Sequence, residues 1–350
     1  MASRACRRGL ALASLVGVGA AGGLVLASCG FLGEEPFRGR RSPDVAPWHD
    51  LGPVAFGPAP GEVREPSPLV EDNQVVLYVE RHSGASGELW RATSPDGMRF
   101  RFTPERPVLT PDARDAGRAG APTVFRQGDG TYLLAYANGA GQLRRATSRD
   151  GIAFTVDPAP LLVPSMAWEQ SGLDAPALAP APAGGLLLYY GTVARDAIGV
   201  AESADGILFR AAVEPVLVPA DVMDPILWRK LDHIASPFAE PARDPRGQPF
   251  LRIYFSARGQ ESGTAVQSGV PMEIPPNFSV GEAATTDGRT LIPWPFNPIF
   301  DRIQVFVLHP AELEPAVIPL GSRRLLYYRA AAADESPPTN VGVAENPVGG

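Results

Sequence analysis

Three acidic residues with the potential for catalysis lie at or beside x-Pro dipeptides. Glu65 precedes Pro66, Glu314 precedes Pro315, and Asp174 lies two residues before Pro176. Two carboxyl groups that share a pocket, one protonated and one ionised, can carry out general acid–base catalysis. Each acid taken singly can equally be a solvated loop residue. A shared site therefore requires a fold in which the chain returns repeatedly to one place.

An internal repeat provides such a return. Three similar segments begin 54 and 55 residues apart: Ala92–Phe100, Ala146–Phe154 and Ala201–Phe209, with a weaker copy at Ala284–Gly288. Each contains Asp-Gly between β-prone runs, which predicts a hairpin with a two-residue type I′ turn. A period of this length is typical of propeller, solenoid or array units.

Each repeat also contains an earlier pair of apolar segments, so that one unit has four predicted strands. In the second unit, Pro122–Phe125 precedes Tyr132–Tyr136. A fifth unit near the C-terminus has only three strands, and Pro53–Phe56 matches the missing fourth. The sequence therefore predicts an all-β, five-bladed β-propeller with four-stranded antiparallel blades. Pairing of the N-terminal strand with the C-terminal blade would close the ring and remove free sheet edges.

The first residues form a separate unit. Residues 1–28 combine three arginines with an uncharged apolar run, the pattern of a signal peptide. Leu26–Cys29 resembles the bacterial lipobox, which implies lipidation of Cys29 and attachment to the cell envelope. Gly30 after this cysteine is compatible with the outer membrane of a Gram-negative cell. The alternative is an uncleaved transmembrane anchor. Residues 29–48 are expected to be a flexible tether, and 49–350 the propeller.

Composition excludes several classes of function. Without the three leader arginines, 28 basic residues face 38 acidic ones, a net charge of −10, which argues against a nucleic-acid partner. The four histidines have no partner at zinc-binding spacing, and no Gly-x-Ser-x-Gly motif is present. We therefore predict no cofactor and no metal. Whether the central channel binds an ion is left open by the sequence. We expect a monomer.

Five units that pair an x-Pro inner strand with a Ser-x-Asp-Gly-x-x-Phe hairpin resemble the five-bladed β-propeller glycoside hydrolases, the clan of arabinanases, xylosidases, levansucrases and invertases. The resemblance covers roughly Pro53 to Asn346. It implies a base at Glu65, a tuning carboxylate at the position of Ala121, and an acid at Asp174 or Ala175. Ala121 carries no carboxylate, and Asp115 or Glu169 is a candidate replacement.

The same resemblance implies a carbohydrate site at the end of the propeller where the x-Pro positions converge. Aromatic side chains over carboxylates suit a sugar, because the ring stacks on an indole while the hydroxyls meet polar groups. Trp168 and Trp228 can instead pack between blades. The candidate substrate-binding residues are Arg118, Trp168, Glu169, Trp228, His233, His309 and Glu314.

Two classes of function are compatible with the sequence. The protein is expected to be an exported, lipid-anchored, glycosidase-like propeller that hydrolyses or binds a carbohydrate, with Glu65 and Asp174 as the catalytic pair if it is an enzyme. The alternative is a propeller that serves as a scaffold for protein interaction at the cell surface. The Asp residues of the Asp-Gly turns are expected to be structural, since Ser and Asp side chains bond backbone groups within turns.

Overall fold

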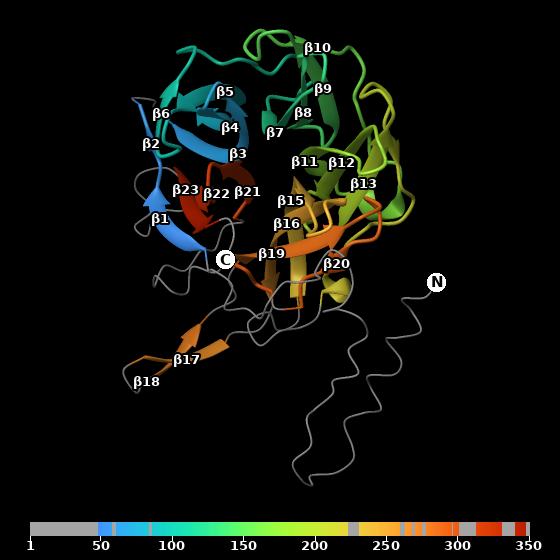
Figure 1. Ribbon diagram of the computed structural model, residues 1–350. Helices are drawn as coiled ribbons and strands as arrows, with labels where there is room; N and C mark the ends of the chain where they lie inside the picture. Colours follow the sequence, from blue (N-terminus) through green and yellow to red (C-terminus); the bar gives the residue numbers. More distant parts are fainter. Residues whose placement is uncertain are drawn as a thin grey trace.

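The computed structural model describes residues 48–57, 61–83, 86–222, 231–259, 263–267, 270–274, 278–295, 297–300, 313–330 and 340–347. Five antiparallel sheets are arranged in a ring, as Figure 1 shows. This arrangement confirms the predicted all-β, five-bladed propeller. Within the described ranges, no helix is long and apolar enough to cross a membrane.

Each of the five blades contains four antiparallel strands, and the first strand of each blade begins near the x-Pro position. Blade 1 consists of β3 (Glu62–Glu71), β4 (Gln74–Ser83), β5 (Ser86–Ser94) and β6 (Arg99–Phe102); blade 2 of β7 (Ala119–Arg126), β8 (Tyr132–Asn138), β9 (Leu143–Ser148) and β10 (Thr155–Val156); blade 3 of β11 (Leu173–Pro180), β12 (Leu186–Thr192), β13 (Ile198–Ser203) and β14 (Arg210–Ala211). Blade 4 consists of β15 (Leu231–Arg243), β16 (Pro249–Gly259), β19 (Phe278–Thr285) and β20 (Ile292–Pro293), with the hairpin β17 (Gly263–Gln267) and β18 (Val270–Ile274) inserted before β19; blade 5 of β21 (Ala316–Leu320), β22 (Arg323–Ala330), β23 (Asn340–Pro347) and β1 (His49–Pro53).

The N-terminal strand of blade 5 lies earlier in the chain than predicted. β1 pairs antiparallel with β23, from His49 opposite Glu345 to Pro53 opposite Gly342. The first half of the expected strand Pro53–Phe56 does pair with β23: Pro53 lies opposite Gly342, and the Val54 N–H donates to the Val341 carbonyl at 2.9 Å. Its second half, β2 (Ala55–Phe56), instead pairs in parallel with β6 of blade 1. Phe56 stacks on Phe102 with ring centroids 5.4 Å apart, so that apolar packing draws this segment across to the first blade.

The core lies between neighbouring blades. Every residue of β8 and β12 is buried, as their nearly continuous apolar sequences require. Hydroxyl groups also link the inner strands: Ser67 Oγ accepts a hydrogen bond from the Val124 N–H at 3.1 Å, and Thr123 Oγ1 accepts one from Leu178 at 3.0 Å. These contacts fix the spacing of adjacent blades near the axis.

The Asp-Gly turns differ from the predicted type I′ geometry. Gly97, Gly151, Gly206 and Gly288 have positive φ, whereas the preceding aspartates do not. In blade 1, Ser94 Oγ donates to Asp96 at 2.8 Å, and the Asp96 carboxylate accepts the N–H groups of Met98 and Arg99. The side chains therefore form the turn themselves, and the other three copies repeat the pattern.

Tyrosine hydroxyl groups fasten these turns to the neighbouring blade. Tyr78 donates to the Gly151 carbonyl at 2.7 Å, Tyr189 to Gly288 at 2.8 Å, and Tyr327 to Gly97 at 3.0 Å. Because consecutive strands are antiparallel, the turns lie at the end of each blade opposite the x-Pro positions. At one end of the propeller, tyrosine hydroxyl groups bind the Asp-Gly turns of neighbouring blades. The opposite end carries the x-Pro positions, where the sequence predicts the functional site.

Candidate functional site

Five x-Pro positions meet at the axis of the propeller. The residue before each proline has a left-handed backbone, with φ between 46° and 54°: Glu65, Ala121, Ala175, Ser236 and Glu314. The pairing register shifts at this point in blades 1 to 4. A positive φ is unfavourable for a residue other than glycine. Because the left-handed backbone recurs in all five blades, it belongs to the architecture of the ring.

These five residues and their prolines line a small cavity of about 40 Å³, which we call the axial pocket. The structure thus brings together positions that are separated by as many as 249 residues in the sequence, the span from Glu65 to Glu314. The pocket as it stands has room for water, whereas a sugar ring would have to displace side chains around it.

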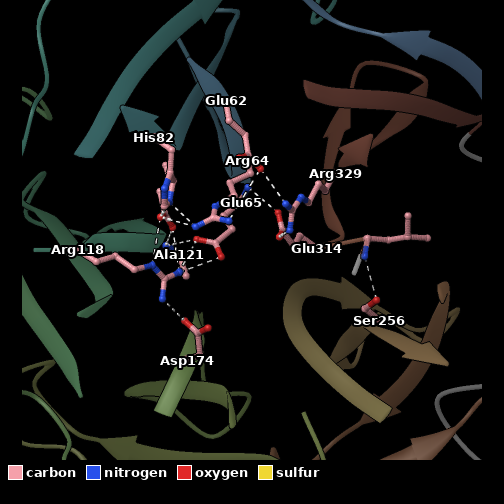
Figure 2. A network of polar contacts seen from close by, with 12 residues as sticks. Glu62, Arg64, Glu65, His82, Arg118, Ala121, Asp174, Ser256, Glu314 and Arg329 are labelled. Atoms are coloured by element: carbon pink, nitrogen blue, oxygen red, sulfur yellow. Dashed lines mark hydrogen bonds and ion pairs between the residues drawn. The ribbon is translucent and has the colours of Figure 1, made fainter. Parts of the chain in front are cut away.

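Glu65, one of the two predicted catalytic acids, lies in the wall of the axial pocket with 14% of its side chain exposed. Its carboxyl group accepts hydrogen bonds from Arg118 Nη2 at 3.1 and 3.2 Å and from the Ala121 N–H. Its own N–H donates to Glu314 Oε2 at 2.8 Å (Figure 2).

Asp174, the second predicted acid, forms an ion pair with the same arginine. Arg118 Nη1 donates to Asp174 Oδ1 at 3.2 Å, and 29% of the Asp174 side chain is exposed. One guanidinium group therefore joins both acids, as Figure 2 shows. Arg118 was predicted to bind substrate, and in this structure its guanidinium group donates to Asp174, Glu65 and Glu80. Neither Arg118 nor Asp174 is among the residues that line the axial pocket.

The central residue that sequence reasoning missed is Glu80, which is fully buried in β4. Its carboxylate accepts hydrogen bonds from Arg64 Nη2 at 3.0 Å, from Arg118 at 3.0 and 3.1 Å, and from the Ala121 N–H at 3.1 Å. His82 also contacts Glu80 through Nε2. The available signal was the alternation of Glu80 and His82 directly after the apolar run Val75–Val79 of the same strand.

The pKa values of Glu65 and Glu80 are shifted in opposite directions. Burial and the neighbouring Glu80 charge raise the pKa of Glu65 well above its usual value, although Arg118 opposes the rise. Burial also favours a higher pKa for Glu80, but hydrogen bonds from Glu65, His82 and Arg118 outweigh it and hold that pKa well below its usual value. These opposite shifts favour protonation of Glu65 over protonation of Glu80.

Glu314, a predicted substrate-binding residue, lines the axial pocket but is engaged by protein groups. Besides the Glu65 N–H, it accepts a hydrogen bond from Arg329 Nη1 at 3.2 Å. Arg329 Nη2 donates in turn to Glu62 Oε1 at 2.8 Å. This part of the network connects blade 5 to blade 1.

His233 does not line the axial pocket. Its Nδ1 lies 2.6 Å from Asp232 Oδ1, and Arg258 Nη2 lies 2.8 Å from the same nitrogen. The ring also meets Phe278 edge-on, with centroids 6.0 Å apart. The other predicted binding residues Trp228 and His309, and the predicted lipidation site Cys29, lie outside the described residues.

Trp168 and Glu169, predicted to bind substrate, pack instead against blade 3. Trp168 stacks on Tyr190 with centroids 5.9 Å apart, and its Nε1 donates to the Val213 carbonyl at 3.0 Å. Glu169 is 1% exposed and accepts hydrogen bonds from the Tyr190 hydroxyl at 2.7 Å and from two loop N–H groups. These contacts hold the loop before β11 against blade 3. The Trp168 ring and the Glu169 carboxylate are therefore already bound by protein groups.

Neither proposed replacement for the carboxylate missing at Ala121 reaches the axial pocket. Glu169 is occupied as described, and Asp115 is buried with Arg144 at 3.1 Å and the Tyr136 hydroxyl at 3.1 Å. Glu80 instead brings a carboxylate to the Ala121 N–H, from a different strand and a different blade. No set of three or more His, Cys, Asp or Glu side chains within the described ranges is arranged to hold a metal ion.

Solved structures with this architecture include several carbohydrate-acting proteins. A glycosyl hydrolase from Bacteroides ovatus has a TM-score of 0.59 at 18% identity, over 88% of this chain and 92% of that one. A thermostable family-43 glycoside hydrolase gives 0.59 at 17% identity, over 85% and 91%. The α-L-arabinofuranosidase from Podospora anserina, in complex with cellotriose, gives 0.57 at 13%, over 86% and 97%.

This chain has the fold of the glycoside hydrolase-type five-bladed propellers. No protein-family model matches the sequence, and no curated protein is significantly similar to it. The shared architecture extends over most of both chains, while identities below 20% leave the chemistry to be argued from the residues of the axial pocket.

Proposed function

We propose that this propeller acts on a carbohydrate at its axial pocket and hydrolyses a glycosidic bond there, with Glu65 as the general acid and Asp174 as the base or nucleophile. The observation that carries the proposal is the pair of acids bound to one guanidinium group. The raised pKa of Glu65, caused by burial and by the Glu80 charge, suits a general acid. Hydrolysis requires one carboxyl group that can protonate the leaving oxygen and a second that is ionised.

In this mechanism Glu65 donates its proton to the glycosidic oxygen, and Asp174 activates water or attacks the anomeric carbon. The sugar must displace the Arg118 side chain from between the two acids. Arg118 is 21% exposed on its side chain and keeps a second carboxylate partner in Glu80, so that it can move without losing every ion pair.

The test is turnover of aryl glycosides and polysaccharides by the full chain and by Glu65→Gln and Asp174→Asn variants. We expect each substitution to lower the rate by about 100-fold or more. Glu240→Gln serves as the control, because Glu240 is also buried and paired with an arginine, Arg324, away from the axial pocket. Equal rates in all four proteins would refute the assignment of the acids.

A non-catalytic glycan receptor is the second candidate. It is favoured by Arg118, which donates hydrogen bonds to both acids, and by the lack of a carboxylate at position 121, where the residue is alanine. Isothermal titration with the same sugars separates the two: binding without turnover in the wild type would establish the receptor. Neither binding nor turnover across the panel would count against a carbohydrate function.

We further propose that the protein is exported and anchored in the bacterial cell envelope through a lipid on Cys29. The support is the leader sequence and the lipobox-like Leu26–Cys29 segment. Fractionation of cells that express the wild type and Cys29→Ala tests this. We expect the variant to leave the membrane fraction, whereas unchanged membrane association with an intact N-terminus would indicate a transmembrane anchor.

A further inference from the structure

A second cavity lies at the end of the propeller that carries the Asp-Gly turns, opposite the axial pocket. Its volume is about 390 Å³, compared with about 40 Å³ for the axial pocket. Turns of blades 3 and 4, which are neighbours in the ring of Figure 1, form its walls. We call it the turn-end cavity. Pockets that bind small molecules commonly measure about 300–1,000 Å³, so that this cavity has room for a ligand as it stands.

A short side chain in the blade 3 turn leaves this space open. Blades 2 and 3 have turns of the same form between their first two strands. In blade 2 the Gln127 N–H donates to the Thr131 carbonyl at 2.8 Å, and in blade 3 the Ala181 N–H donates to the Gly185 carbonyl at 3.0 Å. The Gln127 side chain reaches the Asp-Gly turn of blade 3, since a Cβ atom on Gly206 would lie 3.1 Å from its Nε2. Alanine at position 181 has no such group to extend toward blade 4.

The blade 4 turn is held in place by its own hydrogen bonds. The Asp244 carboxylate accepts the Arg246 N–H at 2.8 Å and the Gln248 N–H at 2.7 Å. The Asp244 N–H donates to the Gln248 carbonyl at 2.9 Å, and Arg243 Nη1 donates to the Gly247 carbonyl at 2.8 Å. The backbone that carries Arg246 and Gln248 is therefore fixed before any ligand arrives, which lowers the entropy lost on binding.

The lining of the turn-end cavity combines apolar surface with a few polar groups. Its apolar members are Pro182, Ala183, Pro249 and Phe250. The side chains of Gln248 and Thr286 also line it, and within the described ranges neither forms a hydrogen bond to another protein group. Asp244 and Arg246 contribute one negative and one positive charge to the lining, which together cancel. Apolar walls with a few polar groups suit the C–H groups and hydroxyl groups of a sugar, and balanced charges favour an uncharged one.

We propose that the turn-end cavity is a second carbohydrate site, which binds a neutral oligosaccharide without cleaving it. The Asp244 carboxylate accepts hydrogen bonds from its own turn, and the lining contains no second acid with which it could form a catalytic pair. The inference rests on the proposed carbohydrate function for the class of its ligand. It does not require catalysis at the axial pocket.

The experiment is an NMR titration of the amide-labelled full chain with neutral trisaccharides: cellotriose, xylotriose and mannotriose. We expect at least one of them to shift the signals of residues 181–185 and 244–248 in a saturable manner, in the wild type and equally in Glu65→Gln. Gln248→Ala should weaken this binding by about 3- to 10-fold, the effect of one lost hydrogen bond. Ala183→Trp should abolish it, because the indole would fill the cavity.

Thr131→Ala is the matched control. Thr131 occupies the position of Gln248 in the corresponding turn of blade 2 and does not line the turn-end cavity, so that its substitution should leave the affinity unchanged. The charge of the ligand is tested with trigalacturonate, which should bind more weakly than the best neutral trisaccharide.

The proposal is overturned if no neutral trisaccharide shifts the two turns, or if Gln248→Ala and Ala183→Trp both bind as tightly as the wild type. Equal or tighter binding of trigalacturonate would overturn the assignment of a neutral ligand. Turnover of aryl glycosides is measured separately. Binding at the turn-end cavity without turnover would remove the hydrolase assignment and leave this site established, whereas turnover without binding there would do the reverse.

Discussion

Glu314 Oε2 accepts a hydrogen bond from the backbone N–H of Glu65 at 2.8 Å, across the junction between the last blade and the first. Glu65 repeats the contact with the Ala121 N–H of blade 2. In both cases the carboxyl group at one x-Pro position caps the N–H at the next. Ala121 and Ala175 have no side-chain acceptor, so that this relay does not continue through blades 2 and 3. The acids at the axis thus contribute to the ring as well as to the site.

Glu314→Ala should reduce stability. The substitution leaves the Glu65 N–H and one Arg329 donor without this acceptor in a buried environment, which costs about 1–3 kcal/mol. Urea unfolding followed by circular dichroism measures the change. Glu345→Ala is the matched control: its pair with Arg323 is exposed by about a third, and such a pair contributes at most about 1 kcal/mol. An equal loss in both variants would contradict the capping role of Glu314.

Removal of β1 should destabilise the whole ring. A chain that starts at residue 54 loses the β1–β23 pairing, the buried Trp48 side chain and the hydrogen bond from the Tyr328 hydroxyl to Asp50 at 2.6 Å. We expect its melting temperature to fall by at least several degrees relative to a chain that starts at residue 44, since an unpaired edge remains. Identical melting curves would show that β1 does not support the last blade.

We expect the aspartates of the Asp-Gly turns to make the free energy of unfolding fall in acid. Hydrogen bonds from two backbone N–H groups lower the pKa of Asp96 and of Asp150 to about 2, from 3.8 in the absence of such bonds. Because the folded pKa is the lower one, this stabilisation is complete above about pH 3.8 and disappears as the pH falls through about 2. The Asp96→Asn, Asp150→Asn double variant keeps a neutral acceptor. Its unfolding free energy should therefore decrease less than that of the wild type over this interval.

Trp168→Ala tests whether this tryptophan packs or binds. The ring stacks on Tyr190, and its Cη2 lies so near Gly199 that a Cβ atom there would be only 2.5 Å away. The indole is only partly buried, so that its loss should cost about 0.5–3 kcal/mol of stability. The affinity of the folded variant for any sugar bound by the wild type should be unchanged. A weaker affinity for the sugar with unaltered stability would instead show that Trp168 belongs to the binding site.

The repeated patterns in the sequence determined the fold. Apolar runs, x-Pro dipeptides and Ser-x-Asp-Gly turns recur at nearly constant spacing, and each specifies a local structure that depends on few distant contacts. Five such units can bury their faces only against one another, which places the x-Pro positions at one axis. Glu65, Asp174 and Glu314 could therefore be assigned to one region before any tertiary structure was known.

Tertiary packing decided what the individual side chains do. The second half of Pro53–Phe56 was assigned to the wrong blade, because the attraction of Phe56 for Phe102 is not visible in a strand pattern. Glu80 was missed, since its importance arises from donors that lie 16 and 38 residues away, Arg64 and Arg118. A sequence records which residues alternate along a strand, but two carboxyl groups share donors only at distances of a few ångströms between strands, and only the folded ring sets those distances.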